Sequence, residues 1–181
     1  MRSLEEDQDA MTTITTPAPL LLRSSAEAPG GSFSRMRQIR FTDCDPAGIV
    51  FYPQYFVMFN DLVEDWVDTA LLIGYRKLII DRRVGLPTVR VEADFRVASH
   101  MGDAVTLSLA VERIGGRSLT LNLRCEGADG AARMNMRQVL VTTSLATLRA
   151  IEIPADLRAA IVHASGIADR GYFDSARLVS Q

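Results

Sequence analysis

A single helix with a broad apolar face is the feature that most constrains how this chain can fold. Within residues 55–71, apolar side chains recur at the three- and four-residue spacing of one helical face. The residues on this face are Tyr55, Phe56, Phe59, Leu62, Val63, Trp66, Val67, Ala70 and Leu71. Gly74 follows as the expected end of the helix. Because an apolar face of this width must be buried, the rest of the chain has to supply a surface that covers it.

The segments after this helix alternate apolar and polar residues, which is the pattern of half-buried strands. Four strands joined by short turns are predicted, over 89–97, 105–111, 119–125 and 132–148. In the last strand the apolar phase slips between Met136 and Val139, which predicts a bulge near Arg137. Short connections between successive strands favour an antiparallel meander.

A shorter strand-like run, 35–41, precedes the helix and has Ile39 and Phe41 on one face. Pro154 opens a short final helix. This order predicts an α+β fold in which one antiparallel sheet wraps around one long central helix. Such a sheet leaves its edge strands and its other face uncovered, so we expect a homodimer or a dimer of dimers, which is a homotetramer.

Composition excludes several classes of function. The 181 residues carry a formal net charge of -2 and no basic stripe, which argues against nucleic-acid binding. Cys44 and Cys125 show no metal-ligand spacing, so we expect no metal site and a reduced, cytoplasmic setting. No run approaches the roughly 18 to 20 apolar residues of a membrane span, so no membrane partner is expected.

The chain length suits one domain, and composition suggests its limits. Residues 1–33 begin with an acidic stretch and continue in Thr, Pro, Ala and Ser, so we expect a disordered N-terminal extension or an upstream start codon. The folded domain is expected over 34–165. The residues 166–181 carry little pattern and are expected to form a C-terminal tail.

The residues most suggestive of chemistry lie in the loop 42–53, directly before the long helix. Its sequence is Thr-Asp-Cys-Asp-Pro-Ala-Gly-Ile-Val-Phe-Tyr-Pro. Asp43 and Asp45 beside a proline commonly do no more than accept backbone hydrogen bonds in a tight turn. A carboxylate beside a helix N-terminus, however, also meets unpaired backbone N–H groups, and acyl transfer uses that combination.

This block resembles the hotdog-fold acyl-CoA thioesterases, in particular the 4-hydroxybenzoyl-CoA thioesterase-like family, over roughly residues 36–161. The strongest match is Asp-Cys-Asp-Pro-Ala-Gly-Ile-Val-Phe-Tyr-Pro at 43–53, followed by Tyr55 and its helix. Weaker matches are Gly-Leu-Pro at 85–87, Gly-Asp at 102–103, Arg-Ser at 117–118 and Ile-Glu-Ile-Pro at 151–154.

The resemblance implies an acyl-CoA thioesterase that needs no cofactor and no metal. Asp45 corresponds to the catalytic carboxylate, acting either as nucleophile on the thioester carbonyl or as general base for water. The backbone amide of Tyr52 corresponds to the oxyanion donor. Gly48, Val50 and Phe51 correspond to residues of the substrate-binding loop. Asp43 is expected to orient the loop, and Cys44 is expected to pack rather than react, because no histidine is positioned to activate it.

Substrate specificity is less firmly implied. Asn60 stands where the 4-hydroxybenzoyl-specific enzymes carry an acid that meets the aromatic hydroxyl, so another aromatic or a short aliphatic acyl group is an equal expectation. Glu64, one turn further on, is a minor candidate for a helix-borne catalytic acid. The phosphates of CoA require cations, and the candidates are Arg113, Arg117 and Arg149.

The sequence has two alternative interpretations. A hotdog protein could bind an acyl thioester without turning it over, and Asp45 argues against that reading. Asp43, Cys44 and Asp45 also resemble the nucleophile motif of a phosphohydrolase. That motif requires a parallel α/β fold and acidic metal ligands, which the predicted antiparallel meander contradicts.

Overall fold

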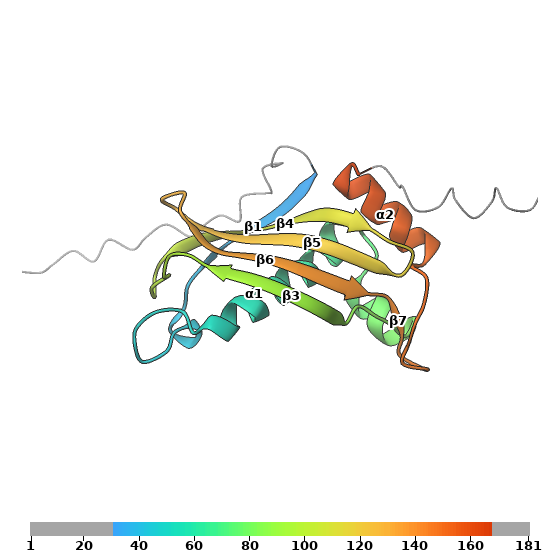
Figure 1. Cartoon of the computed structure of the whole chain (residues 1–181), viewed down its shortest axis with the longest axis horizontal. Helices are drawn as coiled ribbons and strands as arrows, with labels where there is room; N and C mark the ends of the chain where they lie inside the picture. Colours follow the sequence, from blue (N-terminus) through green and yellow to red (C-terminus); the bar gives the residue numbers. More distant parts are fainter. Residues whose placement is uncertain (1–30, 168–181) are drawn as a thin grey trace, which may run out of the picture.

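The computed structural model describes residues 31–167, and its main element is a five-stranded sheet (Figure 1). The strands are β1 (Ser32–Gln38), β3 (Thr88–Phe95), β4 (Ala104–Ile114), β5 (Ser118–Gly127) and β6 (Ala132–Val141). Their order in space is β1-β4-β5-β6-β3, and every pair of neighbours is antiparallel. The antiparallel sheet is therefore confirmed, and β4, β5 and β6 form a meander. The predicted pairing of strand 89–97 with strand 105–111 was wrong, because β1 pairs with that edge of β4 and β3 pairs with β6 at the opposite edge of the sheet.

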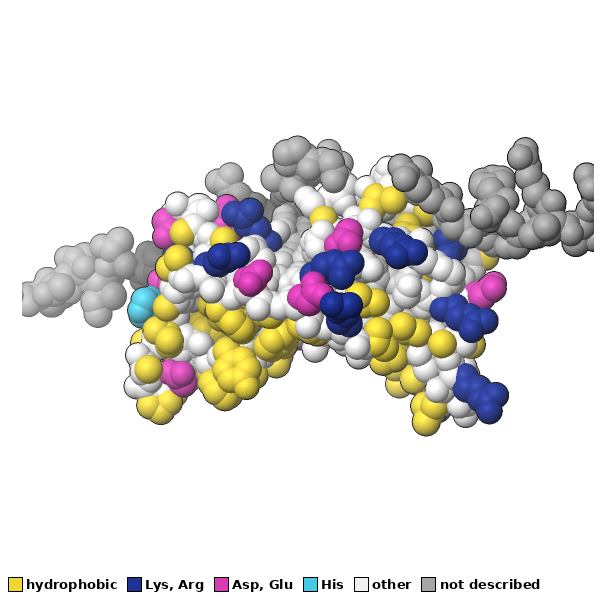
Figure 2. Space-filling view, viewed as in Figure 1, with side chains coloured by type: hydrophobic (Ala, Val, Ile, Leu, Met, Phe, Trp, Pro, Cys, Tyr) yellow, Lys and Arg dark blue, Asp and Glu magenta, His cyan; other side chains and the backbone are white. Residues whose placement is uncertain are grey.

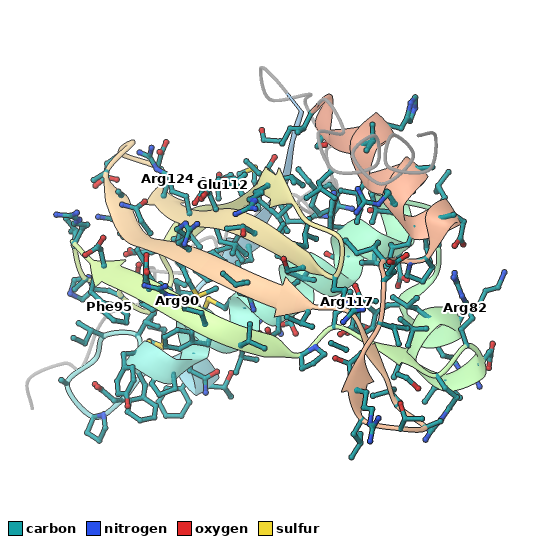
Figure 3. All side chains as sticks on the ribbon, turned by 45° about the vertical axis from the view of Figure 1, so that its right-hand side comes forward. Arg82, Arg90, Phe95, Glu112, Arg117 and Arg124 are labelled. Atoms are coloured by element: carbon teal, nitrogen blue, oxygen red, sulfur yellow. The ribbon has the colours of Figure 1, made fainter. Side chains whose placement is uncertain are left out.

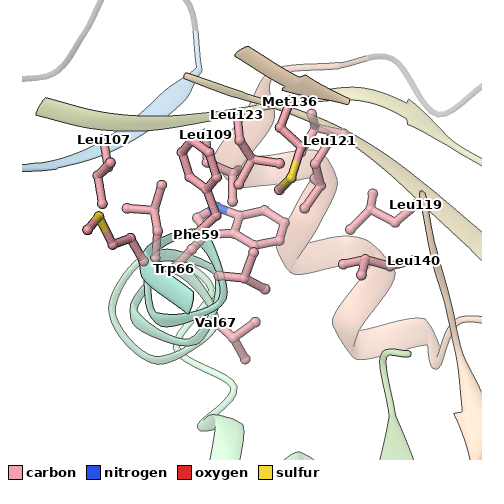
Figure 4. Packing of buried hydrophobic residues seen from close by; sticks show 14 of the residues in the cluster. Phe59, Trp66, Val67, Leu107, Leu109, Leu119, Leu121, Leu123, Met136 and Leu140 are labelled. Carbon is pink, nitrogen blue, oxygen red and sulfur yellow. The ribbon is translucent and has the colours of Figure 1, made fainter. Parts of the chain in front are cut away.

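One long helix lies against the inner face of this sheet. Helix α1 (Tyr52–Asp65) continues through a π-helical turn, η2 (Trp66–Ala70). The side chains of Phe59 and Trp66 are buried against the leucines of β4 and β5, and Val67 is buried on another side of the helix (Figure 4). Each such side chain contributes about 1.5–3 kcal/mol when it leaves water. The predicted fold, a sheet around one central helix, is confirmed.

The end of the long helix differs from the prediction. It stops at Ala70, four residues before Gly74. Leu72 already has a positive φ of 55°, and Gly74 has a φ of 84°, so two residues in the left-handed region turn the chain. The segment that follows is also more regular than expected, because it contains a second π-helical turn, η3 (Lys77–Asp81), and β2 (Val84–Gly85).

The first strand is shifted relative to the prediction. β1 runs from Ser32 and ends at Gln38, whereas Phe41 lies in the short 3₁₀ turn η1 (Phe41–Asp43) and is 80% exposed. Placing Phe41 on an apolar strand face was therefore wrong. The physical reason is the Asp43 carboxylate, which accepts a hydrogen bond from the backbone N–H of Arg40 and turns the chain out of the strand.

The last long strand was also predicted wrongly. β6 keeps one phase, with Met134, Met136, Gln138 and Leu140 all buried, and no bulge at Arg137. Gln138 can occupy the inner face because its Nε2 donates to Thr88 Oγ1 at 2.7 Å. The strand ends at Val141, and the residues up to 150 form the short strands β7 (Thr143–Ser144) and β8 (Arg149–Ala150), which pair beside β2.

Strand β3 was expected to be half-buried, but all its residues are exposed in the single chain. It forms one edge of the sheet, and Val91 and Phe95 are 41% and 49% exposed. Figure 2 shows apolar side chains gathered along the lower border of the molecule, where Figure 1 places β3 and the start of α1. The alternation that predicted burial marks an apolar surface that nothing within one described chain covers.

The final helix, α2 (Ala155–Ser165), begins after Pro154 as predicted and buries Leu157 and Ile161. Its C-terminal end lies against the start of β1, where a side chain at Gly31 would collide with the carbonyl group of Ser165. Most of the predicted extension 1–33 and of the predicted tail 166–181 lies outside the described residues. Within the described residues, no helix is long and apolar enough to cross a membrane.

Candidate active site

The loop 42–53 is a tight hairpin whose backbone hydrogen bonds fix it directly before α1. The N–H of Asp45 donates to the carbonyl of Ile49 at 3.0 Å, and the N–H of Phe51 donates to the carbonyl of Asp43 at 2.9 Å. Gly48 closes the turn with a φ of 78°, and a Cβ there would meet nothing within 4 Å. Glycine is therefore required at this position for its backbone conformation rather than for space.

The carboxylate of Asp45 is half-buried at the tip of this hairpin. Its Oδ1 accepts a hydrogen bond from the N–H of Ala47 at 2.8 Å, which is the Asx-turn geometry expected of an Asp before a proline. Within the part of the chain that the structure describes, its Oδ2 accepts no hydrogen bond. One oxygen is thus used for orientation while the other remains available to a reactant.

The first residues of α1 supply backbone donors close to this loop. Phe51 is the N-cap, with φ -63° and ψ 120°, and Tyr52 is the first helical residue. The N–H of a first helical residue has no partner inside its own helix and points out of the N-terminus. The Tyr52 amide therefore has the character of an oxyanion donor.

The other loop residues named from the sequence are placed differently from one another. Phe51 is 45% exposed, whereas Val50 is 6% exposed and donates its N–H to the carbonyl of Ser99. In the described structure Phe51 is thus open to a ligand and Val50 is packed into the core.

A group of aromatic rings next to the loop was not anticipated from the sequence. The ring of Tyr52 lies 6.2 Å from that of Phe95, and Tyr55 lies 6.1 Å from the same ring. The Tyr55 hydroxyl hydrogen-bonds to Ser99 Oγ at 2.9 Å, and burial raises the pKa of this tyrosine. The signal that could have identified Phe95 is its place at the end of the alternating run on an edge strand.

Cys44 lies between the two aspartates, and its environment does not activate it. Partial burial, followed by the negative charges of Asp43, Asp45 and Asp103, raises the pKa of the Cys44 thiol. A raised pKa lowers the thiolate fraction, which is the nucleophilic form. This electrostatic setting agrees with the expectation that Cys44 packs rather than reacts.

Asn60 and Glu64 are both exposed on α1. Asn60 lies eight residues after Tyr52, which corresponds to roughly 12 Å along a helix axis. Both are therefore on the same helix as Tyr52, and Asn60 is nearer to Tyr52 than Glu64 is.

Arg113, Arg117 and Arg149 are exposed, and the structure does not bring Arg117 close to Asp45 within one chain. Figure 3 shows Phe95, which contacts Tyr52, at one end of the sheet and Arg117 towards the other end. The N-terminal end of β3 is the one nearer Arg117. The backbone N–H of Val141 donates to the carbonyl of Pro87, just before β3, and the N–H of the next residue, Thr142, donates to the carbonyl of Arg117. The eight residues of β3 span roughly 26 Å, which separates the loop from these cations.

Comparison with known proteins identifies the family of this chain. Residues 39–161 match the family model described as the thioesterase-like superfamily. The chain is 28% identical over 132 residues to 4-hydroxybenzoyl-CoA thioesterase of Pseudomonas sp. (strain CBS-3), covering 69% of this chain and 94% of that protein. It is 32% identical over 98 residues to 1,4-dihydroxy-2-naphthoyl-CoA hydrolase of Prochlorococcus marinus (strain MIT 9303), covering 50% of this chain and 65% of that protein.

Solved structures show the same architecture. The Pseudomonas 4-hydroxybenzoyl-CoA thioesterase superposes with a TM-score of 0.65 at 26% identity, covering 71% of this chain and 98% of that one. A mutant of 4-hydroxybenzoyl-CoA thioesterase, complexed with 4-hydroxybenzoyl-CoA, gives a TM-score of 0.67 at 25% identity, covering 72% and 99%. With a family match over most of the described domain and this agreement in fold, the chain belongs to the thioesterase-like superfamily of hotdog-fold enzymes.

Proposed function

We propose that this protein hydrolyses an aromatic acyl-CoA to the free acid and CoA, with Asp45 as the catalytic carboxylate. The observation that carries the proposal is the Asp45 side chain, which is oriented through one oxygen and open at the other, directly before the N-terminus of α1. The matched relatives supply the substrate class, because their names specify hydrolysis of aromatic CoA thioesters.

The chemistry that such a site has to perform is limited. A thioester releases a good thiolate leaving group, so the enzyme must mainly supply an oxygen nucleophile and stabilise the oxyanion. As a nucleophile, Asp45 would form a mixed anhydride and expel CoA thiolate, and water would then release the acid. As a general base, it would take a proton from the water that attacks the carbonyl. In both routes the Tyr52 amide would donate to the oxyanion, an interaction worth about 10²–10³ in rate elsewhere.

The exposed edge strand suggests where the CoA cations come from. If β3 strands of two copies pair antiparallel about a two-fold axis, the Phe95 end of one copy lies beside the Thr88 end of the other. The Thr88 end is the end near Arg117, because the adjacent residues Val141 and Thr142 hydrogen-bond to the carbonyls of Pro87 and Arg117. Asp45 of one copy would then face Arg113 and Arg117 of the other, so a homodimer would complete the site.

The decisive test is release of free thiol from a panel of aromatic, short-chain and long-chain acyl-CoAs. Wild-type protein should favour the aromatic members, and Asp45→Asn should lose most of that activity. Asp61→Asn, on the exposed face of α1, is the matched control and should retain it. Failure of the wild type on every substrate would favour a non-catalytic acyl-thioester-binding protein, and a fully active Asp45→Asn would refute the assignment of Asp45.

Two further measurements separate mechanisms. In a single turnover in oxygen-18 water, followed by mass analysis of enzyme and product, label in the Asp45 carboxylate would identify it as the nucleophile of an anhydride that water opens at the Asp45 carbonyl. A general base would leave Asp45 unlabelled and place the label only in the product acid. Loss of activity in the presence of a chelator would revive the phosphohydrolase reading of Asp43 and Asp45.

A further inference from the structure

We infer that Arg37 and Asp43 form a positioning pair that holds the Asp45 hairpin against the sheet and so sets the rate of the chemical step. The inference rests on the proposed function of Asp45. Neither residue of the pair would touch the reacting atoms. Their role is to fix where those atoms lie.

The pair is well defined in the structure. Arg37 Nη2 donates to both carboxylate oxygens of Asp43, at 3.1 Å and 2.9 Å. The backbone N–H of Arg40 adds a third hydrogen bond to Oδ2 at 2.7 Å. The Asp43 side chain is only 9% exposed, so its charge is largely removed from water and is compensated by these donors. Its carboxylate is therefore committed to the structure rather than to a substrate.

The position of Asp43 explains why this pair would control Asp45. Its side chain bonds back to β1, while its backbone carbonyl accepts the N–H of Phe51, the residue that caps α1. One residue thus joins the strand, the first turn of the hairpin and the start of the helix. Asp45 is two residues further along, so a shift of Asp43 moves the carboxylate relative to the Tyr52 amide.

Loss of the Arg37 guanidinium would leave a buried carboxylate short of its main counter-charge. Such a group seeks water or another partner, because an unpaired charge is costly in a poorly solvated site. The hairpin is the part free to respond, since Asp43 lies outside the ladder of the main sheet. Displacements of about 1 Å cost about a hundredfold in rate where reacting groups must be aligned.

Arg35 provides a matched control on the same strand. It lies two residues before Arg37 and pairs with Asp65 of α1 at 3.4 Å, in a bridge whose acid is 54% exposed. Both are arginines of β1 paired to an aspartate, but Asp65 lies at the other end of α1 from the hairpin. A general effect of removing charge from β1 should appear in both variants.

The experiment compares Arg37→Gln, Arg37→Lys, Asp43→Asn and the Arg37→Gln/Asp43→Asn double variant with Arg35→Gln. Arg37→Gln should lower kcat by about ten- to a hundredfold and leave KM within about twofold. Arg37→Lys, which keeps the charge, should recover part of kcat. The double variant should lose no more than the worse single variant, because residues that act as one unit are not additive.

Hydrogen exchange of the peptide covering 42–53 gives a readout that does not depend on catalysis. Its amides should exchange about tenfold faster or more in Arg37→Gln, with no change in Arg35→Gln. Unaltered exchange, or an unaltered kcat, in a folded Arg37→Gln protein would overturn the inference. If Asp45→Asn remained active, the proposed function would fail instead, and the exchange measurement would still decide whether the pair holds the hairpin.

Discussion

The ring of Tyr52 lies edge-on to the ring of Phe95, with centroids 6.2 Å apart and an interplanar angle of 88°. Tyr52 is the first residue of the central helix and Phe95 is the last residue of the edge strand β3. Both side chains remain about half exposed, at 59% and 49%. The proposed oxyanion donor therefore stands at the border of the surface through which we expect two copies to associate.

Association through β3 can be tested by placing a charge on its inner face. In Val91→Lys the two copies would bring like charges together in an apolar strip, which should raise the dissociation constant at least about a hundredfold. Light scattering should show a lower mass than for the wild type. Thr106→Lys, on the outer face of β4, is the control and should leave the mass unchanged. An unchanged mass for Val91→Lys would place the interface elsewhere.

The oxyanion role of the Tyr52 amide can be tested with proline, which removes the N–H. The first helical position tolerates proline, and Phe51 already has the extended conformation that a residue before proline requires. Tyr52→Pro should lower kcat by about 10²–10³. Tyr52→Ala also loses the ring but keeps the N–H, so the difference between the two variants measures the amide alone. Equal losses would argue against the oxyanion assignment.

Asn60 offers a test of acyl specificity. Asn60→Asp should raise kcat/KM for 4-hydroxybenzoyl-CoA relative to benzoyl-CoA by about tenfold, because a carboxylate accepts a stronger hydrogen bond from a phenol than an amide does. Asn135→Asp, on β6 beside Arg124, is a matched control and should leave the ratio unchanged. A constant ratio in Asn60→Asp would show that Asn60 does not meet the acyl group.

The two thiols should differ in reactivity in a pH-dependent way. Burial raises the pKa of Cys125 to about 12, and burial with nearby acids raises the pKa of Cys44. At a pH below the raised pKa, a smaller fraction of the thiol is present as thiolate, which is the reactive form. Cys44 should therefore react with a thiol reagent more slowly than free cysteine at pH 8, and its rate should increase as the pH rises. Cys125 should react only after unfolding. Cys44→Ser should remove the native reactivity while hydrolysis persists; loss of hydrolysis would make Cys44 a catalytic candidate again.

The spacing of apolar residues predicted the buried helix and strands well, because burial of one face requires apolar residues at regular intervals along the chain. The apolar face of α1 and the alternation through β4 and β5 follow directly from packing. The same reasoning failed at β3, since an apolar face that is exposed at the sheet edge has the same alternating pattern as one buried in its own chain. It also failed at Gln138, where one hydrogen bond to Thr88 lets an amide occupy the inner face.

In the candidate site, too, the local features were predicted from the sequence and the tertiary contacts were not. The Asp45 hairpin was identifiable because its residues are contiguous, and its turn chemistry is local. Arg37 and Phe95 were not identified, because their parts depend on tertiary contacts to Asp43 and Tyr52. Arg113 and Arg117 were named as cations without any indication that they lie at the opposite end of the sheet from the carboxylate.

Gly31 lies against Ser165 at the end of α2, so the two ends of the described domain are adjacent in space. A short linker from 167 to 31 could join its ends, and new ends could be opened at the Gly115–Gly116 turn between β4 and β5, far along the chain from the Asp45 hairpin. A circularly permuted chain would have its strands in a different sequence order but could keep the same contacts between them.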